Sequence, residues 1–187
     1  MVHIMLAEGF EEIEALAPAD ILRRGGLDVS LTGVTGAKVT GSHGITVTCD
    51  RTVEGLDARD IELLILPGGM PGAENLYKSD PLRSLIRSVV SNEGYIAAIC
   101  AAPLVLGRMG LLRGKNAICY PGIEKHLEGS NIIEDAYVVT DGRFITAKGA
   151  GVAAHFAFTL LTLLKDMETA KAVHAAMQYP KDDGFFA

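Results

Sequence analysis

Short apolar runs of strand length alternate with helix-length segments along most of this chain, and this alternation constrains the fold more than any other feature. Ile61–Leu66 and Tyr95–Ile99 are almost entirely apolar, which is typical of strands buried on both faces. Glu11–Arg24 and Pro81–Ser91 carry apolar residues at helical spacing. Buried strands separated by helices predict an α/β fold, here a doubly wound sandwich with a mostly parallel central sheet.

The same patterns predict the remaining elements. Further strands are expected at Val2–Ala7, Leu27–Val34, Val39–Gly41, Ile45–Cys49, Ala117–Cys119, Tyr137–Thr140 and Phe144–Thr146. Further helices are expected at Ala101–Met109, Gly151–Leu164 and Met167–Met177. Pro18 lies inside the first helix, where proline can introduce a kink. No repeat or linker divides the sequence, so we expect a single domain over residues 1–187.

Composition narrows the classes of function. Hydrophobic residues make up 49% of the chain and charged residues 21%, and the net charge is −6. This balance offers no basic patch for nucleic acid and no polybasic signal for a membrane surface. No apolar run reaches the length of a membrane span, and no leader segment is recognisable. Cys49, Cys100 and Cys119 form neither a disulfide framework nor a metal-binding pair, so we expect a protein of the reducing cytoplasm.

Three loops that follow predicted strands stand out. They are Glu8–Glu14 after the first strand, Pro67–Gly72 after the Ile61 strand, and the turn at Cys100 after the Tyr95 strand. In a doubly wound sheet, ligands bind outside the carboxyl ends of the strands, near the point where the strand order reverses. We therefore expect these three loops to lie together and to form the functional site.

Cys100 is the strongest candidate for a reactive residue. It lies between a strand end and a helix start, which resembles the nucleophile elbow of hydrolases with sulfur in place of oxygen. The N-terminus of the following helix would favour the thiolate, the reactive form of cysteine. The alternative is an inert cysteine that acts as a small buried hydrophobic residue.

Backbone amides and a carboxyl group could complete such a site. Gly68, Gly69 and Ala101 can present backbone N–H groups to an oxyanion, although a double glycine is also compatible with a simple tight turn. Acidic residues at the start of a helix are expected from the helix dipole. Glu14, however, is placed to face the crevice, where burial would keep its carboxyl group protonated and able to donate or shuttle a proton.

No histidine is evident as a base for the cysteine. None of the five histidines is adjacent to Cys100, and a Cys-His-acid triad is therefore not indicated. His43, in the tight turn Ser42-His43-Gly44, could reach the crevice, including from across a dimer interface.

Taken together, the motifs resemble the DJ-1/ThiJ/PfpI family, and its DJ-1-like branch in particular. They are Leu6–Glu14, Asp20–Gly25, Ile65–Gly69, Ala97–Pro103 and Thr146–Gly151, and the likeness runs almost end to end. The resemblance implies a flavodoxin-like sandwich, similar to class I glutamine amidotransferases, that forms a homodimer. It also implies a reactive Cys100 prone to oxidation to the sulfinic acid, a protonated Glu14, and oxyanion amides at Gly69 and Ala101.

Two departures from the family pattern bear on activity. Protease-like relatives carry histidine directly after the nucleophile, where this chain has Ala101, which argues against a peptidase. Relatives with glyoxalase or deglycase activity often carry histidine before a proline in a later loop, where this chain has Tyr120. Tyr120 or Glu14 would then have to replace that histidine. His43 occupies a position near the dimer interface that often holds arginine in the family.

The sequence therefore predicts an enzyme that acts on small 2-oxoaldehydes. In this hypothesis Cys100 attacks methylglyoxal, the amides of Gly69 and Ala101 hold the oxyanion, and lactate forms without a metal or organic cofactor. A protein deglycase would use the same residues. The alternative is a redox-responsive stress protein or chaperone, in which oxidation of Cys100 is a signal and no substrate is turned over. An amidotransferase-like hydrolase would require a histidine partner that the sequence does not offer.

Overall fold

The computed structural model describes residues 1–180 and 185–186, and its centre is a seven-stranded sheet. The strands are β1 (Val2–Leu6), β2 (Val29–Gly33), β5 (Arg51–Thr52), β6 (Leu63–Leu66), β7 (Tyr95–Ile99), β10 (Val138–Asp141) and β11 (Phe144–Ala147). Their spatial order is β10-β11-β7-β6-β1-β2-β5, and every neighbouring pair is parallel except β10 with β11. This confirms the predicted doubly wound, mostly parallel sheet.

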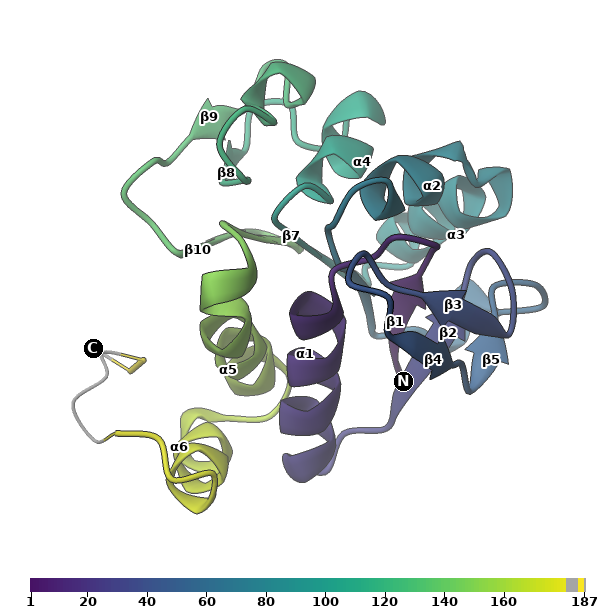
Figure 1. Cartoon of the computed structure of the whole chain (residues 1–187). Helices are drawn as coiled ribbons and strands as arrows, with labels where there is room; N and C mark the ends of the chain where they lie inside the picture. Colours follow the sequence, from purple (N-terminus) through teal and green to yellow (C-terminus); the bar gives the residue numbers. More distant parts are fainter. Residues whose placement is uncertain (181–184, 187) are drawn as a thin grey trace.

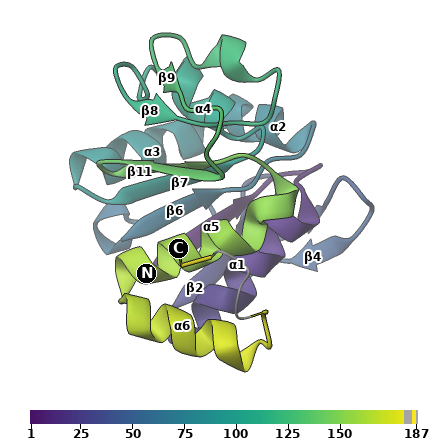
Figure 2. The same ribbon diagram turned by 90° about the vertical axis from the view of Figure 1, so that its left-hand side faces the viewer.

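Helices cover both faces of the sheet (Figures 1 and 2). One face carries α1 (Glu12–Arg24), α5 (Ala153–Leu164) and α6 (Met167–Ala176), and the other carries α2 (Gly72–Lys78), α3 (Asp80–Ser91) and α4 (Pro103–Arg108). The alternation of side chains along β1 supplies both cores. Ile4 and Leu6 pack under α1 and α5, whereas Met5 packs under α2 and α3, and all three are fully buried.

Two small sheets lie outside the main one. β3 (Lys38–Thr40) and β4 (Thr46–Thr48) form the predicted antiparallel hairpin, which packs beside the start of α1 (Figure 1). β8 (Asn116–Ala117) and β9 (Asn131–Ile132) pair in parallel. No helix within the described part of the chain is long and apolar enough to cross a membrane.

Several element boundaries differ from the sequence-based expectation. The helix expected at Ala101–Met109 is shorter, because residues 100–102 form the turn that reverses the chain after β7. α1 runs through Pro18 without interruption and buries it, so the expected kink does not end the helix. β5 and α2 were not anticipated, because each is short and neither carries a strong apolar period.

The strand order explains why the three loops meet. The chain passes from β1 to β2 on one side and later enters β6 on the other side of β1, so the order reverses at β1 and β6. The segments after these two strands leave the same edge of the sheet, and β7 adds Cys100 beside them.

Candidate active site

The backbone of Cys100 is held in an unusual conformation at the end of β7. Its φ angle is +64°, a left-handed value that non-glycine residues rarely adopt. The Cys100 N–H donates to the carbonyl oxygen of Ala147 over 2.9 Å, and its own carbonyl accepts from the N–H of Tyr120 over 2.8 Å. Such strain persists only where neighbouring contacts enforce it, and it is concentrated at functional sites. The half-buried side chain is thereby fixed at the carboxyl edge of the sheet.

Two backbone amides point at the sulfur of Cys100. The N–H groups of Gly69 and Ala101 both hydrogen-bond to the thiol. Gly69 has a φ of +83°, and a Cβ atom there would lie 2.5 Å from the backbone nitrogen of Glu11, so glycine is required at this position. The structure thus brings together the cysteine and the two amides that the sequence suggested as oxyanion donors.

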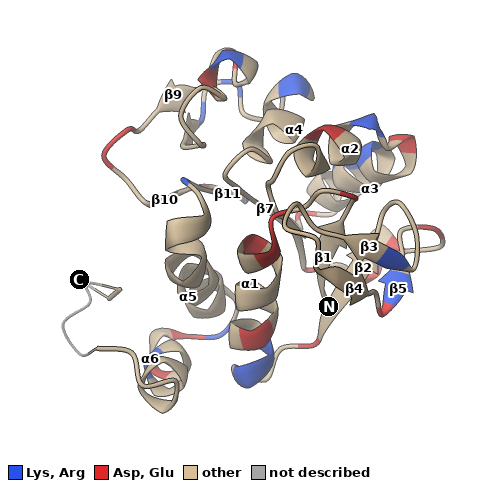
Figure 3. Cartoon of the chain, viewed as in Figure 1, with Lys and Arg blue, Asp and Glu red and all other residues tan. Residues whose placement is uncertain are grey.

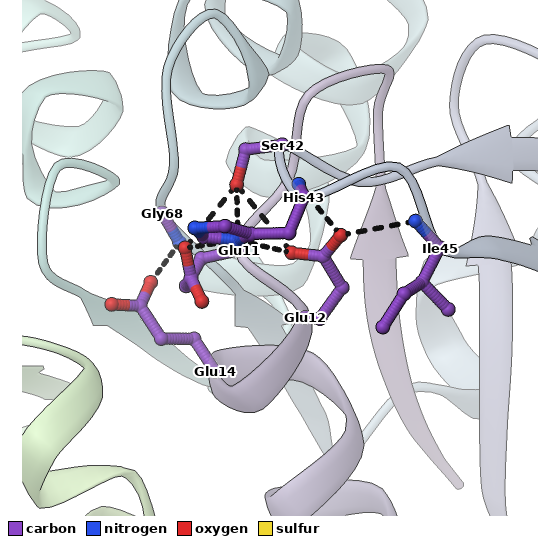
Figure 4. A network of polar contacts seen from close by, with 7 residues as sticks. All are labelled: Glu11, Glu12, Glu14, Ser42, His43, Ile45 and Gly68. Atoms are coloured by element: carbon purple, nitrogen blue, oxygen red, sulfur yellow. Dashed lines mark hydrogen bonds and ion pairs between the residues drawn. The ribbon is translucent and has the colours of Figure 1, made fainter.

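Glu14 supplies the carboxyl group of the site. It lies in the first turns of α1 and is fully buried. Its Oε2 accepts a 2.7 Å hydrogen bond from the N–H of Gly68 (Figure 4). The carboxyl group also lies within hydrogen-bonding reach of the Cys100 thiol. Oε1 is also buried, and among the described residues it has no hydrogen-bond partner of good geometry. A buried carboxyl group with so few donors favours its neutral form.

The proton affinities of this pair follow from burial. Burial raises the pKa of Glu14 to about 7, and the charge of Glu11 adds to this effect, so both protonation states are populated near neutrality. Burial and the neighbouring Glu14 carboxylate raise the pKa of Cys100 to about 12, although the two backbone amides oppose the rise. Burial thus opposes the effect of the helix N-terminus and disfavours the Cys100 thiolate, whereas the direction of the shift at Glu14 agrees with the neutral carboxyl group expected from the sequence.

Gly68 has a different role from the one the sequence suggested. Because its N–H donates to Glu14, this amide is not free to bind an oxyanion. A Cβ atom at Gly68 would lie 2.7 Å from Oε2 of Glu14 and 2.8 Å from the nitrogen of Ala101. This corrects the assignment of Gly68 to the oxyanion donors: the residue holds the carboxyl group and leaves room for it.

Tyr120 borders the same space from the opposite loop. A Cβ atom at Gly149 would lie 3.4 Å from the ring of Tyr120 and 4.0 Å from the sulfur of Cys100, so these two residues flank Gly149. The tyrosine is 54% exposed. Sequence reasoning did not single out Gly149 as a site residue. The signal was present in its position two residues after β11, the strand that pairs with β7.

His43 contacts acidic residues at the start of α1 and not the reactive cysteine. Its Nδ1 is 2.9 Å from Oε2 of Glu12 and 3.4 Å from Oε2 of Glu11, and Ser42 joins the same network (Figure 4). Burial acts to raise the pKa of Glu12, but hydrogen bonds from the side chain of His43 and from nearby backbone N–H groups outweigh it and lower the pKa to about 2. The hydrogen bond to Glu12 raises the pKa of His43. No contact with Cys100 is found for His43.

Among the residues that the structure describes, Glu11, Glu12 and His43 are the candidates for holding a cation. Donor atoms of Glu11, Glu12 and His43 lie within 4.8 Å of one another, at the acidic start of α1 that Figure 3 shows in red. These atoms already bind each other and the backbone of the hairpin turn. The arrangement is therefore explained as an ion pair that joins the hairpin to α1.

Known proteins match this chain over nearly all of its length. The model of the DJ-1/PfpI family matches residues 1–163. Protein DJ-1 homolog B of Arabidopsis thaliana is 36% identical over 174 residues, which cover 92% of this chain and 40% of that protein. Glutathione-independent glyoxalase DJR-1.2 of Caenorhabditis elegans is 33% identical over 161 residues, which cover 86% of each chain.

A solved structure agrees equally well. The crystal structure of Drosophila melanogaster DJ-1beta superposes with a TM-score of 0.91 at 34% sequence identity, covering 96% of this chain and 97% of that one. The chain spans about two fifths of the Arabidopsis relative and most of the length of the other two. The matching family model, the close superposition and the shared fold together show that this chain belongs to the DJ-1/PfpI family.

Proposed function

We propose that this protein is a cysteine-dependent enzyme that converts 2-oxoaldehydes such as methylglyoxal into 2-hydroxy acids. The observation that carries the proposal is the placement of the Cys100 thiol between one buried carboxyl group and two backbone amides. Every step below uses these groups and water. A relative named as a glutathione-independent glyoxalase supports the same chemistry.

The first step forms a bond between sulfur and the aldehyde carbon. Ionised Glu14, available because its pKa is about 7, takes the proton of the Cys100 thiol as the sulfur attacks. The carbonyl π electrons move to oxygen, and the N–H groups of Gly69 and Ala101, which already face the sulfur, stabilise the oxyanion. Glu14 then returns the proton to that oxygen, which gives a neutral hemithioacetal.

The second step moves a hydrogen between the two carbons. Glu14, ionised again, takes the proton from the former aldehyde carbon; the released electron pair forms a double bond to the neighbouring carbon, and the ketone π electrons move to its oxygen, which gives an enediolate. Glu14 returns this proton to the second carbon while the hydroxyl proton on the first carbon passes to the second oxygen, which gives a lactoyl thioester on Cys100. One carbon is oxidised and the other is reduced, so no external oxidant is needed. Water then cleaves the thioester to lactate and the free thiol.

The enzyme is expected to act as a homodimer. Two large aliphatic side chains, Ile13 and Ile45, are 55% and 54% exposed. Both are linked to Glu12, Ile13 as its neighbour in sequence and Ile45 through a hydrogen bond from its N–H group. Large aliphatic side chains exposed on neighbouring segments are typical of a subunit interface. Sedimentation of an Ile13→Glu/Ile45→Glu variant should show monomers where the parent protein shows dimers.

The test of the proposed activity is direct measurement of lactate. The parent protein should form lactate from methylglyoxal over many turnovers, and Cys100→Ser and Glu14→Gln should not. Cys49→Ser is the matched control, because Cys49 lies between β4 and β5, outside the site, and this variant should retain full activity. Loss of methylglyoxal alone does not distinguish a glyoxalase from a protein deglycase, because removal of the free aldehyde also reverses early glycation adducts. If no more than one equivalent per Cys100 is consumed, the proposed activity is wrong.

One observation favours a second candidate, a redox-responsive protein. The half-buried sulfur of Cys100 has two amide donors and a protonatable carboxyl group around it, and the same donors could bind the oxygens of a sulfinate. In this case hydrogen peroxide would oxidise Cys100 stoichiometrically, and Cys100→Ser would abolish the response without any lactate being formed by the parent protein.

A further inference from the structure

The loop formed by residues 118–127, here named the Tyr120 loop, is fixed at its first end to the reactive cysteine. The N–H of Tyr120 donates to the carbonyl oxygen of Cys100 over 2.8 Å. A turn follows, in which the N–H of Ile123 binds the carbonyl oxygen of Tyr120 over 3.0 Å. A short 3₁₀ helix, η2 (Glu124–His126), completes the loop. The ring of Tyr120, itself 54% exposed, depends on this loop for its position.

The second end of the loop packs directly on α4. A Cβ atom at Gly107 would overlap the carbonyl oxygen of His126, so the two backbones touch and only glycine fits between them. The ring nitrogens of His126 lie 3.5 and 3.4 Å from two nitrogens of the Arg108 guanidinium group. These contacts are long hydrogen bonds between the guanidinium group and the imidazole ring, and they tie the second end of the loop to α4.

Arg108 is itself held by α2. Its guanidinium group makes two 2.8 Å hydrogen bonds to the carboxylate of Glu74, and it lies 5.0 Å from the ring centroid of Tyr77. The side chains of Arg108 and Glu74 are 23% and 27% exposed, so solvent only partly weakens this bidentate pair. Burial and the charges of Arg108 and Lys125 lower the pKa of His126, against the opposing effect of Glu74. A neutral ring has an acceptor nitrogen and can take a hydrogen bond from the guanidinium group without charge repulsion.

We propose that Glu74, Arg108 and His126 are positioning residues that hold Tyr120 beside Cys100. α4 begins three residues after the cysteine, so the loop is attached at both ends to the segment that carries the nucleophile. Removing the Arg108 side chain would weaken the attachment of the loop to α4 and would let the ring of Tyr120 move away from the sulfur. The consequence for substrate binding rests on the proposed function, whereas the placement of Tyr120 does not.

The experiment is a double-mutant cycle with two readouts. Tyr120→Ala, Arg108→Met and the double variant are compared with the parent protein, and Arg113→Met serves as the control because Arg113 is an exposed cation just beyond α4. The first readout is the rate of alkylation of Cys100 by iodoacetamide, followed by mass spectrometry. The second is kcat and KM for methylglyoxal. His126→Phe keeps a ring but removes the nitrogens that contact Arg108, and His126→Ala removes the whole ring.

If Arg108 acts through Tyr120, Arg108→Met should not change the alkylation rate of Cys100 further in a protein that already lacks the tyrosine. We expect Tyr120→Ala to raise the alkylation rate about fivefold, Arg108→Met to raise it by a smaller factor, and the double variant to match Tyr120→Ala. His126→Phe and His126→Ala should both resemble Arg108→Met, because each removes the ring nitrogens, and the change in turnover should appear in KM more than in kcat. Arg113→Met should change neither readout.

Two results would overturn the proposal. One is an unchanged alkylation rate in Arg108→Met, and the other is a double variant in which the two single effects multiply. Thermal melting of each variant verifies folding, and His126→Phe provides a milder change if Arg108→Met proves unstable. If no variant turns over methylglyoxal but the alkylation rates follow the expected pattern, the proposed activity fails while the positioning role of the three residues stands.

Discussion

Glu12 and Glu14 lie two residues apart on one helix, are 5% and 0% exposed, and have opposite shifts in pKa. The carboxylate of Glu12 lies beneath the hairpin turn. It accepts hydrogen bonds from the backbone N–H and Nδ1 of His43, at 2.8 and 2.9 Å, and from the N–H of Ile45 at 3.4 Å. Glu14 receives one backbone bond, from Gly68, and faces a thiol. The pKa of Glu12 falls to about 2, whereas that of Glu14 rises to about 7.

The difference shows that the number of donors, and not burial alone, sets the charge of these residues. A carboxylate with several donors stays ionised and acts as a structural anchor, as Glu12 does for the hairpin. A carboxyl group with few donors titrates near neutrality and can exchange protons with a substrate. One helix thus carries a structural glutamate and a candidate catalytic glutamate in its first turn.

The largest expected effect comes from removing the titratable group beside the sulfur. Glu14→Gln keeps the size and the acceptor for Gly68 but cannot move a proton, so turnover of methylglyoxal should fall by about 100- to 10,000-fold. Glu12→Gln, the matched change on the same helix, should retain most of the activity. Steady-state lactate formation checks both. Equal losses in the two variants would remove the distinction between the two glutamates.

The next largest effect is on stability. Glu14→Gln, which should lower activity, is expected to increase the free energy of unfolding at neutral and alkaline pH. Because folding raises the pKa of Glu14 above its unfolded value, the unfolded chain releases this proton first, and stability falls as the pH rises from about 4.5 to about 7. Glu14→Gln removes this loss. Above pH 7 the variant should be more stable than the parent by about 2 to 3 kcal/mol, with little difference near pH 4. Urea unfolding at both pH values measures it, and a difference independent of pH would contradict the raised pKa.

A smaller effect on stability is expected from Glu12→Gln, and this change should lower the stability of the protein. The neutral amide loses charge-assisted bonds to His43, and the free energy of unfolding at neutral pH should fall by about 1 to 3 kcal/mol. Because folding lowers the pKa of Glu12 to about 2, this contribution is present above about pH 4.5 and is lost as the pH falls further. Urea unfolding between about pH 3 and pH 7 tests the sign. An effect that grows on acidification would refute the anchoring role.

The smallest effect should come from the exposed partner of the ion pair. His43→Gln keeps a side-chain donor but removes the positive charge. The hydrogen bond to Glu12 raises the pKa of His43, so its contribution is fully present below about pH 6.5 and is lost as the pH rises through the folded pKa. The variant should therefore melt below the parent at acidic pH and close to it at alkaline pH. A melting difference that is larger at alkaline pH would show that charge is not the cause.

Much of the fold could be predicted from the sequence because its strands are strongly apolar. Tyr95–Ile99 was predicted with its observed bounds, and Ile61–Leu66 contains all of β6. β5 has only two residues, Arg51 and Thr52, at the edge of the sheet, too few to show a period. α2 begins at a glycine and buries little beyond Ala73 and Leu76, so its sequence gives no amphipathic signal.

The site could be predicted in part. Strand order brought together Cys100, Glu14, Gly69 and Ala101, since loops at one edge of a parallel sheet converge. The protonation of Cys100 was not predictable, because it depends on burial and on the charge of a neighbour from a different strand-to-helix unit. Gly68 was misassigned for a similar reason: a glycine-rich turn reveals that amides are exposed, but not which acceptor each one meets.

The pH dependence of kcat/KM for methylglyoxal tests most directly the claim that Glu14 is the proton-transfer group for Cys100. This ratio reports the ionisation of essential groups in the free enzyme. Because the pKa of Glu14 is about 7, kcat/KM should rise tenfold per pH unit on the acidic side and level off above an apparent pKa near 7. A profile that is flat from about pH 5 to pH 9, or that levels off at the pKa of an ordinary carboxyl group, would contradict the account.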